Sequence, residues 1–218
     1  QYGSPWFNIL ELIELRGMDW SSTYRLVRQL GNRAGFDWSA EAITGVLDLS
    51  GRRPYLVQLL AARVTDDLNM QGRDRVTGSD VATAAGDLLD EINLTGSYVG
   101  FVWHEAQWFG RLVLWELLQS TTGLSLRELS RRVRQQLESG QTPLSSGHFD
   151  KRFDERFYWL ADVADALEYR SPAPPGNGRN KEIGFSIPLV QRWLKQLLAH
   201  ETDFRQRALA GIVEELQA

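Results

Sequence analysis

One residue type and several sequence patterns are missing from this chain of 218 residues, and each absence excludes a class of protein or site. There is no cysteine, which excludes disulfides, thiolate zinc sites and cysteine nucleophiles. No apolar run approaches the roughly eighteen residues that a membrane span needs, and no signal-peptide pattern opens the sequence. We therefore expect no contact with a membrane and a cytoplasmic location.

The signatures of common catalytic sites are absent as well. There is no G-x-x-x-x-G-K-[ST] loop to hold phosphates, and no strand followed by an acidic pair to bind magnesium. A G-x-S-x-G elbow is missing, and His104, His148 and His200 lack the spacing of metal ligands. We expect the chain by itself to hydrolyse no ATP, to hold no metal and to bind no cofactor.

Apolar residues at helical spacing predict four helices in the first half of the chain. They cover about 19–35, 39–50, 54–70 and 77–92. Ser21 or Ser22 is the expected N-cap of the first helix and Ser39 that of the second. Thr77 and Asp80 have the spacing of a capping box, which begins the fourth. No strand pattern occurs here, so we expect a compact helical subdomain.

The second half combines helices with a short β ribbon. Beyond a joint at Gly96, Ser97 and Gly100, helices are predicted over about 101–122, 125–139 and 147–166, with Ser125 and Glu128 as a second capping box. Strands are predicted at 167–170 and 183–187, and Pro188 begins a last apolar helix. Three helices followed by a two-stranded ribbon predict a winged helix. The expected fold class is mainly α: a helical bundle followed by a winged-helix domain with a small two-stranded β wing.

The segment SGRRPYLVQLL, residues 50–60, is the strongest candidate for a binding site. Gly51 ends one helix, Arg52 and Arg53 follow, and Pro54 begins the next helix. The free backbone N–H groups and the macrodipole of a helix N-terminus attract anions, so these arginines could face a phosphate. The alternative is a loop with solvated arginines, and the residues alone do not decide between the two.

Five segments have the order and spacing of a known family. They are SPWFNILELIEL, SGRRPYLVQLL, VTGSDVATA, FVWHEAQW and FSIPLVQRWL. Together they resemble the C-terminal half of a STAND-type P-loop ATPase, a branch of the AAA+ class, from Ser4 to about Leu198. In that family the chain leaves the ATPase sheet, forms a helical lid with a Gly-His-Pro-Tyr-type corner, and continues into a winged helix.

The resemblance implies a division into parts and a nucleotide contact. Residues 1–97 would be the lid subdomain, with 1–18 leaving the ATPase core, followed by a winged-helix domain (98–200) and a C-terminal helix (201–218). Pro54 would pack beside the base of ATP or ADP, with Arg53 and Arg52 as further nucleotide-binding candidates. These arginines depart from the Gly and His that are usual in the family.

The same resemblance implies that the chain is incomplete. The first residue is not methionine, and the sequence from Tyr2 to Phe7 looks like the interior of a longer protein, so we expect a fragment. The implied partner is the missing P-loop domain of the same protein, beside a protein partner or a second copy. Nucleotide would bind only in the full-length protein, and the chain alone would not be an enzyme.

A second hypothesis is a DNA-binding winged-helix protein with an N-terminal dimerisation bundle. Its candidate phosphate contacts are Lys151, Arg152 and Arg156 on the third helix of the winged helix, and Arg179 and Lys181 in the ribbon loop. Further candidates are Arg170, Arg131, Arg132 and Arg134. Acidic residues are interleaved with these bases, and the net charge of −4 provides no overall basic field. A mixed, solvated helix face is the other interpretation of the same residues.

The tryptophans suggest a third hypothesis. Most of them fall in helical patterns of the second half and are expected in its core: Trp103, Trp108, Trp115, Trp159 and Trp193. Three others lie near the starts of segments: Trp6, Trp20 and Trp38. As exposed residues they would be anchors for a protein partner, and the chain would then be an interaction scaffold.

Overall fold

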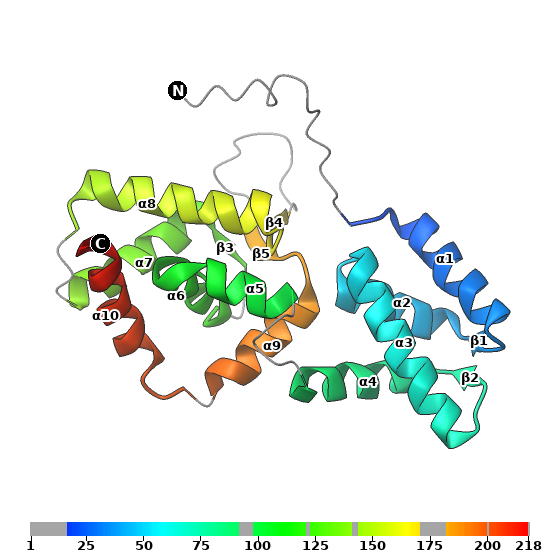
Figure 1. Cartoon of the computed structure of the whole chain (residues 1–218). Coiled ribbons are helices and arrows are strands. Elements are labelled where there is room, and N and C mark those ends of the chain that lie inside the picture. Colours follow the sequence, from blue (N-terminus) through cyan, green and yellow to red (C-terminus); the bar gives the residue numbers. More distant parts are fainter. Residues whose placement is uncertain are drawn as a thin grey trace, which may run out of the picture.

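The fold is mainly α-helical, as predicted, with a few short strands in two small sheets. The computed structural model describes residues 17–91, 98–120, 123–140, 144–170, 182–199 and 201–217. Figure 1 shows two groups of helices, α1–α4 and α5–α10, and α9 contacts both α2 and α4 where the groups meet. Within the described ranges, no helix is both long and apolar enough to cross a bilayer.

The N-terminal unit contains the four predicted helices: α1 (Trp20–Arg33), α2 (Ala40–Ser50), α3 (Pro54–Gln71) and α4 (Gly78–Glu91). Ser39 caps α2 as predicted. Thr77 and Asp80 form the expected reciprocal capping box, in which the Thr77 N–H donates to the Asp80 carboxylate at 2.8 Å. The predicted serine cap of α1 is wrong, because the Asp19 carboxylate accepts from the Ser22 N–H at 2.8 Å and takes that role.

The N-terminal unit also contains two strands that the sequence did not predict. β1 (Asp37–Trp38) and β2 (Arg75–Val76) pair in parallel, with Trp38 opposite Val76. Each strand has two residues, which is too short to show an alternating pattern. The pair holds the connection before α2 beside the connection before α4.

The C-terminal unit combines six helices with a three-stranded sheet. The helices are α5 (Tyr98–Glu105), α6 (Gln107–Leu118), α7 (Leu126–Ser139), α8 (Ser146–Tyr158), α9 (Pro188–Ala199) and α10 (Phe204–Gln217). The strands are β3 (Leu124–Ser125), β4 (Leu167–Arg170) and β5 (Glu182–Phe185), in the antiparallel order β3-β5-β4. The predicted two-stranded ribbon is therefore confirmed, and β3 adds a third strand beside β5.

Two of the predicted helices are interrupted. The structure has two helices, α5 and α6, where a single helix was expected over 101–122. The chain changes direction at Gln107, the first residue of α6, whose φ is +54°. Gly100 lies inside α5 rather than in a joint, and Gly96 and Ser97 lie outside the described residues. The helix expected to reach residue 166 passes into a π-helical turn (η2, Trp159–Val163), which leaves Val163 58% exposed instead of on the apolar face.

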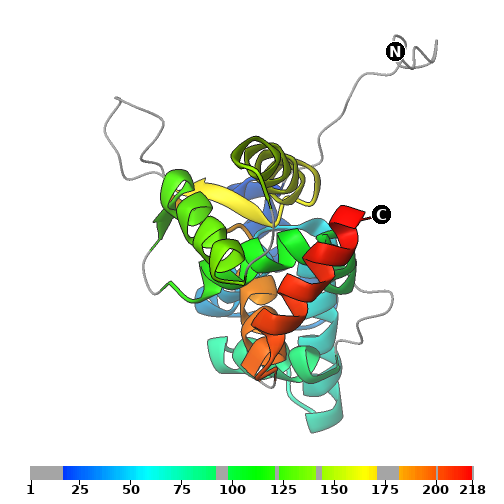
Figure 2. The same ribbon diagram turned by 90° about the vertical axis from the view of Figure 1, so that its left-hand side faces the viewer.

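The core of the C-terminal unit is aromatic, as the tryptophan pattern predicted. Trp103 and Trp193 are buried with ring centroids 6.4 Å apart, and Phe204 of α10 lies 5.8 Å from Trp103. Three further tryptophans pack against this core and are partly buried: Trp108, Trp115 and Trp159. In Figure 2 this unit stands in front of the N-terminal unit, with α10 (red) across it, and α10 packs on α6.

The three proposed anchor tryptophans do not form a common surface. Trp38 is only 5% exposed and belongs to the core, so its role as an exposed anchor is wrong. Trp20 is 47% exposed and stacks on Tyr24 with ring centroids 4.9 Å apart. Trp6 lies outside the described residues.

Candidate functional site at the junction of the two units

The corner between α2 and α3 consists of residues 50–54, and its backbone is left-handed at two consecutive positions. Gly51 has φ +56° and Arg52 has φ +60°. The Ser50 hydroxyl accepts a hydrogen bond from the Arg52 N–H at 3.1 Å, and the same N–H donates to the Leu47 carbonyl. These contacts end α2 and redirect the chain, so that Pro54 becomes the first residue of α3.

The three predicted nucleotide-binding residues have different surroundings at this corner. Arg52 and Pro54 are exposed beside the N-terminus of α3. Arg53 instead points towards the C-terminal unit, where its Nη2 forms an ion pair with Asp165, and its side chain is only 15% exposed. Its Nε and Nη1 atoms are buried without a hydrogen-bond partner among the described residues. Arg53 is therefore part of the contact between the units.

The C-terminal side of this contact is the connection between η2 and β4, together with the end of β5. Asp165 is left-handed, with φ +48°, and its carbonyl accepts a hydrogen bond from the Ser186 hydroxyl. The Ser186 N–H donates to the Ala166 carbonyl at 3.0 Å. A Cβ atom added to Gly51 would lie 2.5 Å from the Ser186 carbonyl oxygen. We call the contact of the corner with Asp165 and Ser186 the junction.

The sequence did not indicate Asp165 as a functional residue. Residues up to 166 were predicted to be helical, and an aspartate near the end of a helix is ordinarily solvated. Asp165 lies instead in the connection between the end of η2 and the start of β4, where its backbone is left-handed and its carboxylate pairs with Arg53. No local sequence signal joins Asp165 to Arg53, which is distant in the chain.

We expect the variant Asp165→Asn to lower the free energy of unfolding by about 2 kcal/mol, because it leaves the Arg53 charge largely buried and uncompensated. Asparagine tolerates the left-handed backbone, so the substitution changes the charge without adding strain. Urea unfolding would measure the loss. The matched control is Asp150→Asn at an exposed pair with Arg134, expected to cost less than about 1 kcal/mol. Equal losses in the two variants would contradict a special role for the Arg53 pair.

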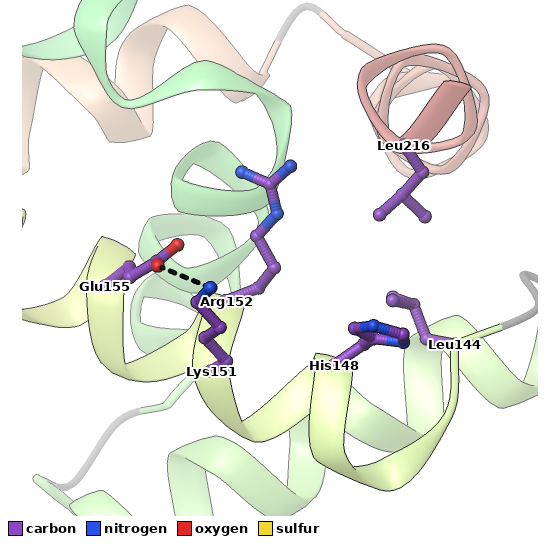
Figure 3. Close-up of a pocket in the computed structure, with 6 residues that line it drawn as sticks. All are labelled: Leu144, His148, Lys151, Arg152, Glu155 and Leu216. Carbon is purple, nitrogen blue, oxygen red and sulfur yellow. Dashed lines mark ion pairs between the residues drawn. The ribbon is translucent and has the colours of Figure 1, made fainter. Parts of the chain in front are cut away.

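The basic residues of the DNA hypothesis lie partly on α8, beside an open hollow of about 520 Å³. Lys151 lies 3.9 Å from Glu155, and Arg156 donates a hydrogen bond to the side chain of Gln107. Figure 3 shows the Arg152 side chain extending into the space between α8 and Leu216 of α10. Two other candidates, Arg179 and Lys181, lie outside the described residues, and so does the side chain of Arg170.

The arginines of α7 form ion pairs with neighbouring carboxylates. Hydrogen bonds from Arg131 and then Arg132 lower the pKa of Glu128 to about 2, although burial acts in the opposite direction. Arg134 pairs with Asp150 at 2.6 Å and lies 4.2 Å from the centroid of the Phe149 ring. The charges of Arg131, Arg132 and Arg134 are therefore balanced locally, and these three arginines offer little free positive charge to a phosphate backbone.

The histidines do not form a metal site in the described part of the chain, where no cluster of three histidine or acidic side chains is suited to a cation. His148 Nδ1 lies 2.9 Å from the Ser145 hydroxyl at the start of α8. His200 lies outside the described residues.

Comparison with known proteins assigns no family to this geometry. The sequence matches no protein-family model, and it shows no significant similarity to a curated protein.

Proposed function

We propose that this chain is the lid and winged-helix portion of a STAND-like, ATP-binding switch protein in the cytoplasm, whose P-loop core lies elsewhere in the polypeptide. The order of the elements supports this assignment. A four-helix bundle with a Gly-Arg-Arg-Pro corner comes first, and then α6, β3, α7, α8, β4 and β5 follow in the order of a winged helix. The ligand would be ATP or ADP, bound only by the complete protein, and the chain alone would have no enzymatic activity.

The observation that carries the proposal is the two-sided contact of the corner. Arg53 and Gly51 pack on the C-terminal unit, through the ion pair with Asp165 and the close approach to Ser186. Arg52 and Pro54 are exposed on the same turn, next to the N-terminus of α3, where an anion is favoured. A nucleotide bound to the exposed side would bias the position of the lid against the winged helix, which is what a switch requires.

Nucleotide binding by the complete protein tests this role. We expect Arg52→Glu to weaken ATP binding about tenfold, equivalent to roughly 1.4 kcal/mol, because it places a negative charge beside the phosphates. Arg127→Glu is the matched control, since Arg127 is an exposed arginine in the first turn of α7. Isothermal titration calorimetry would compare the two variants with the parent protein. Equal affinities for ATP would contradict nucleotide contact at the corner.

Two simpler observations bear on the assignment to a STAND-like protein. A Walker A lysine should occur in the coding sequence roughly 150 to 200 residues before Tyr2, as expected for a P-loop domain of ordinary size. The purified chain should release no phosphate from ATP above the level of a buffer blank. Robust hydrolysis by the chain alone would exclude the proposal.

DNA binding, the alternative function, has weaker support from the described residues. Lys151 lies within reach of Glu155, and three of the four arginines of α7 (Arg131, Arg132 and Arg134) pair with acidic neighbours. Among the candidates on the described part of α8, Arg152 and Arg156 form no ion pair, and Arg152 extends into the space between α8 and Leu216 of α10. A mobility shift with duplex DNA at low salt, lost in Arg152→Glu, would favour the alternative over the switch.

A further inference from the structure

We propose that a groove between α1 and α3 binds an acidic amphipathic helix of a protein partner. The groove has a volume of about 190 Å³, and aliphatic side chains from both helices line it together with Trp38. On α1 it is lined by Leu26 and Leu30, and on α3 by Val57 and Ala61. The nucleotide of the proposed switch function would bind at the corner and not in this groove, so the inference goes beyond that function.

The size of the groove decides which kind of ligand it fits. Pockets for nucleotides and other small molecules generally have volumes of about 300 to 1,000 Å³. A volume of about 190 Å³ is too small for such a ligand, but it suits one bulky aliphatic or aromatic side chain. An amphipathic helix binds through several apolar side chains on one face, and one of them would fill this hollow while its neighbours lie on the exposed rim.

The rim of the groove is unusually apolar for a surface. Leu30 is 50% exposed, and Leu26 is also exposed one turn earlier on the same helix. Contiguous exposed apolar side chains on a water-facing helix are typical of protein interaction sites.

The wall of the groove contains an unsatisfied hydrogen-bond donor. The indole Nε1 of Trp38 is buried and has no acceptor among the described residues. Its ring edge lies directly against Gly31, which also lines the groove. A side chain at position 31 would collide with this ring edge, so the glycine is required for the shape of the groove.

The charge of α1 indicates the chemistry of the partner. Arg25, Arg28 and Arg33 are exposed on α1, and no acidic residue occurs between Trp20 and Arg33. These arginines favour a helix with acidic flanks beside its apolar anchor. They disfavour a symmetric pairing of two copies through α1, because each copy would present the same positive charges to the other.

A titration with synthetic peptides tests the proposal. The probe is a fluorescently labelled amphipathic helix of about 18 residues, with leucine and tryptophan on one face and glutamate on its flanks. The matched peptide has lysine in place of every glutamate. Fluorescence anisotropy with the full chain should show saturable binding of the acidic peptide only. We expect Leu30→Asp to weaken that binding at least about tenfold and Arg28→Glu to weaken it several-fold.

Control variants distinguish peptide binding in the groove from non-specific binding to exposed apolar residues and from loss of the folded state. Val163→Asp changes an equally exposed apolar residue in η2 and should leave the affinity for the peptide unchanged. Thermal melting by circular dichroism should show Leu30→Asp folded at the titration temperature, since Leu30 is half exposed.

Five results would overturn the inference. The first is equal binding of both peptides, and the second is binding by Leu30→Asp as tight as by the parent chain. The third is displacement of the peptide by duplex DNA, which would assign the basic face of α1 to nucleic acid. The fourth is binding only by a chain lacking residues 1–16, and the fifth is loss of a dimer in Leu30→Asp. In the last two cases the groove would be occupied by the protein itself. None of these outcomes depends on ATP, so they leave the switch proposal to its own tests.

Discussion

The variant Gly51→Ala is expected to lower the free energy of unfolding by about 3 kcal/mol, through two separate effects. Gly51 has φ +56°, and a residue with a Cβ atom pays roughly 1 to 2 kcal/mol in this conformation. The new methyl group would also lie 2.5 Å from the Ser186 carbonyl oxygen and 3.1 Å from a side-chain carbon of Ile187. Because the carbonyl belongs to the backbone, it cannot move aside by a change of rotamer, and overpacking of this kind costs about 1 to 3 kcal/mol.

Gly72→Ala is the matched control for this prediction. Gly72 ends α3 as Gly51 ends α2, and its φ of +63° is nearly the same, but no atom lies within 4 Å of an added Cβ. The control should therefore lose only the conformational part, about 1 kcal/mol. Urea unfolding followed by tryptophan fluorescence would measure both variants. The additional loss of free energy in Gly51→Ala measures the close packing at the junction, and equal losses would show that the corner does not pack tightly on Ser186.

The second large effect is expected at the contact of α10 with α6. A Cβ atom added to Gly211 of α10 would overlap the indole ring of Trp108. The Arg111 guanidinium lies 4.6 Å from the centroid of that ring and limits its movement. The backbone N–H of Trp108 also donates to the Glu215 carboxylate of α10 at 2.7 Å, which ties the two helices together at this point. We expect Gly211→Ala to lower the free energy of unfolding by about 2 kcal/mol as α10 is pushed away from α6.

Gly86→Ala is the control for Gly211→Ala, and it should change stability in the opposite direction. Gly86 is also inside a helix, α4, and an added Cβ would meet nothing within 4 Å. Alanine there should raise the free energy of unfolding by about 0.5 to 1 kcal/mol through its helix propensity. Thermal melting of the two variants would distinguish the effects. A gain in both would mean that Trp108 moves aside without cost.

Helix starts were the most predictable part of the fold. Ser39 and Ser125 cap their helices through hydrogen bonds that span only three residues. Pro54 and Pro188 begin helices because a proline ring has no N–H to leave unpaired. These signals depend only on neighbouring residues, so they can be recognised in the sequence without the tertiary structure.

Interruptions within helices were not predictable in the same way. The turn at Gln107 requires a positive φ in a glutamine, which no local sequence preference favours. The π-helical turn in Trp159–Val163 likewise continues the helical spacing of the apolar residues of α8, so the sequence gives no sign of it. Both departures occur where neighbouring elements pack, so tertiary contacts override the local preference.

The sequence by itself determined one side of the candidate site, and the tertiary structure decided the other. Gly51 and Pro54 mark the corner between two helices in the sequence, and Arg52 and Arg53 follow as the charged residues at a helix start. Only the folded chain separates the two arginines, with Arg52 exposed and Arg53 paired with Asp165. The physical reason is distance along the chain: a cap or a turn is specified by residues a few positions apart, whereas an ion pair between two units depends on how those units pack.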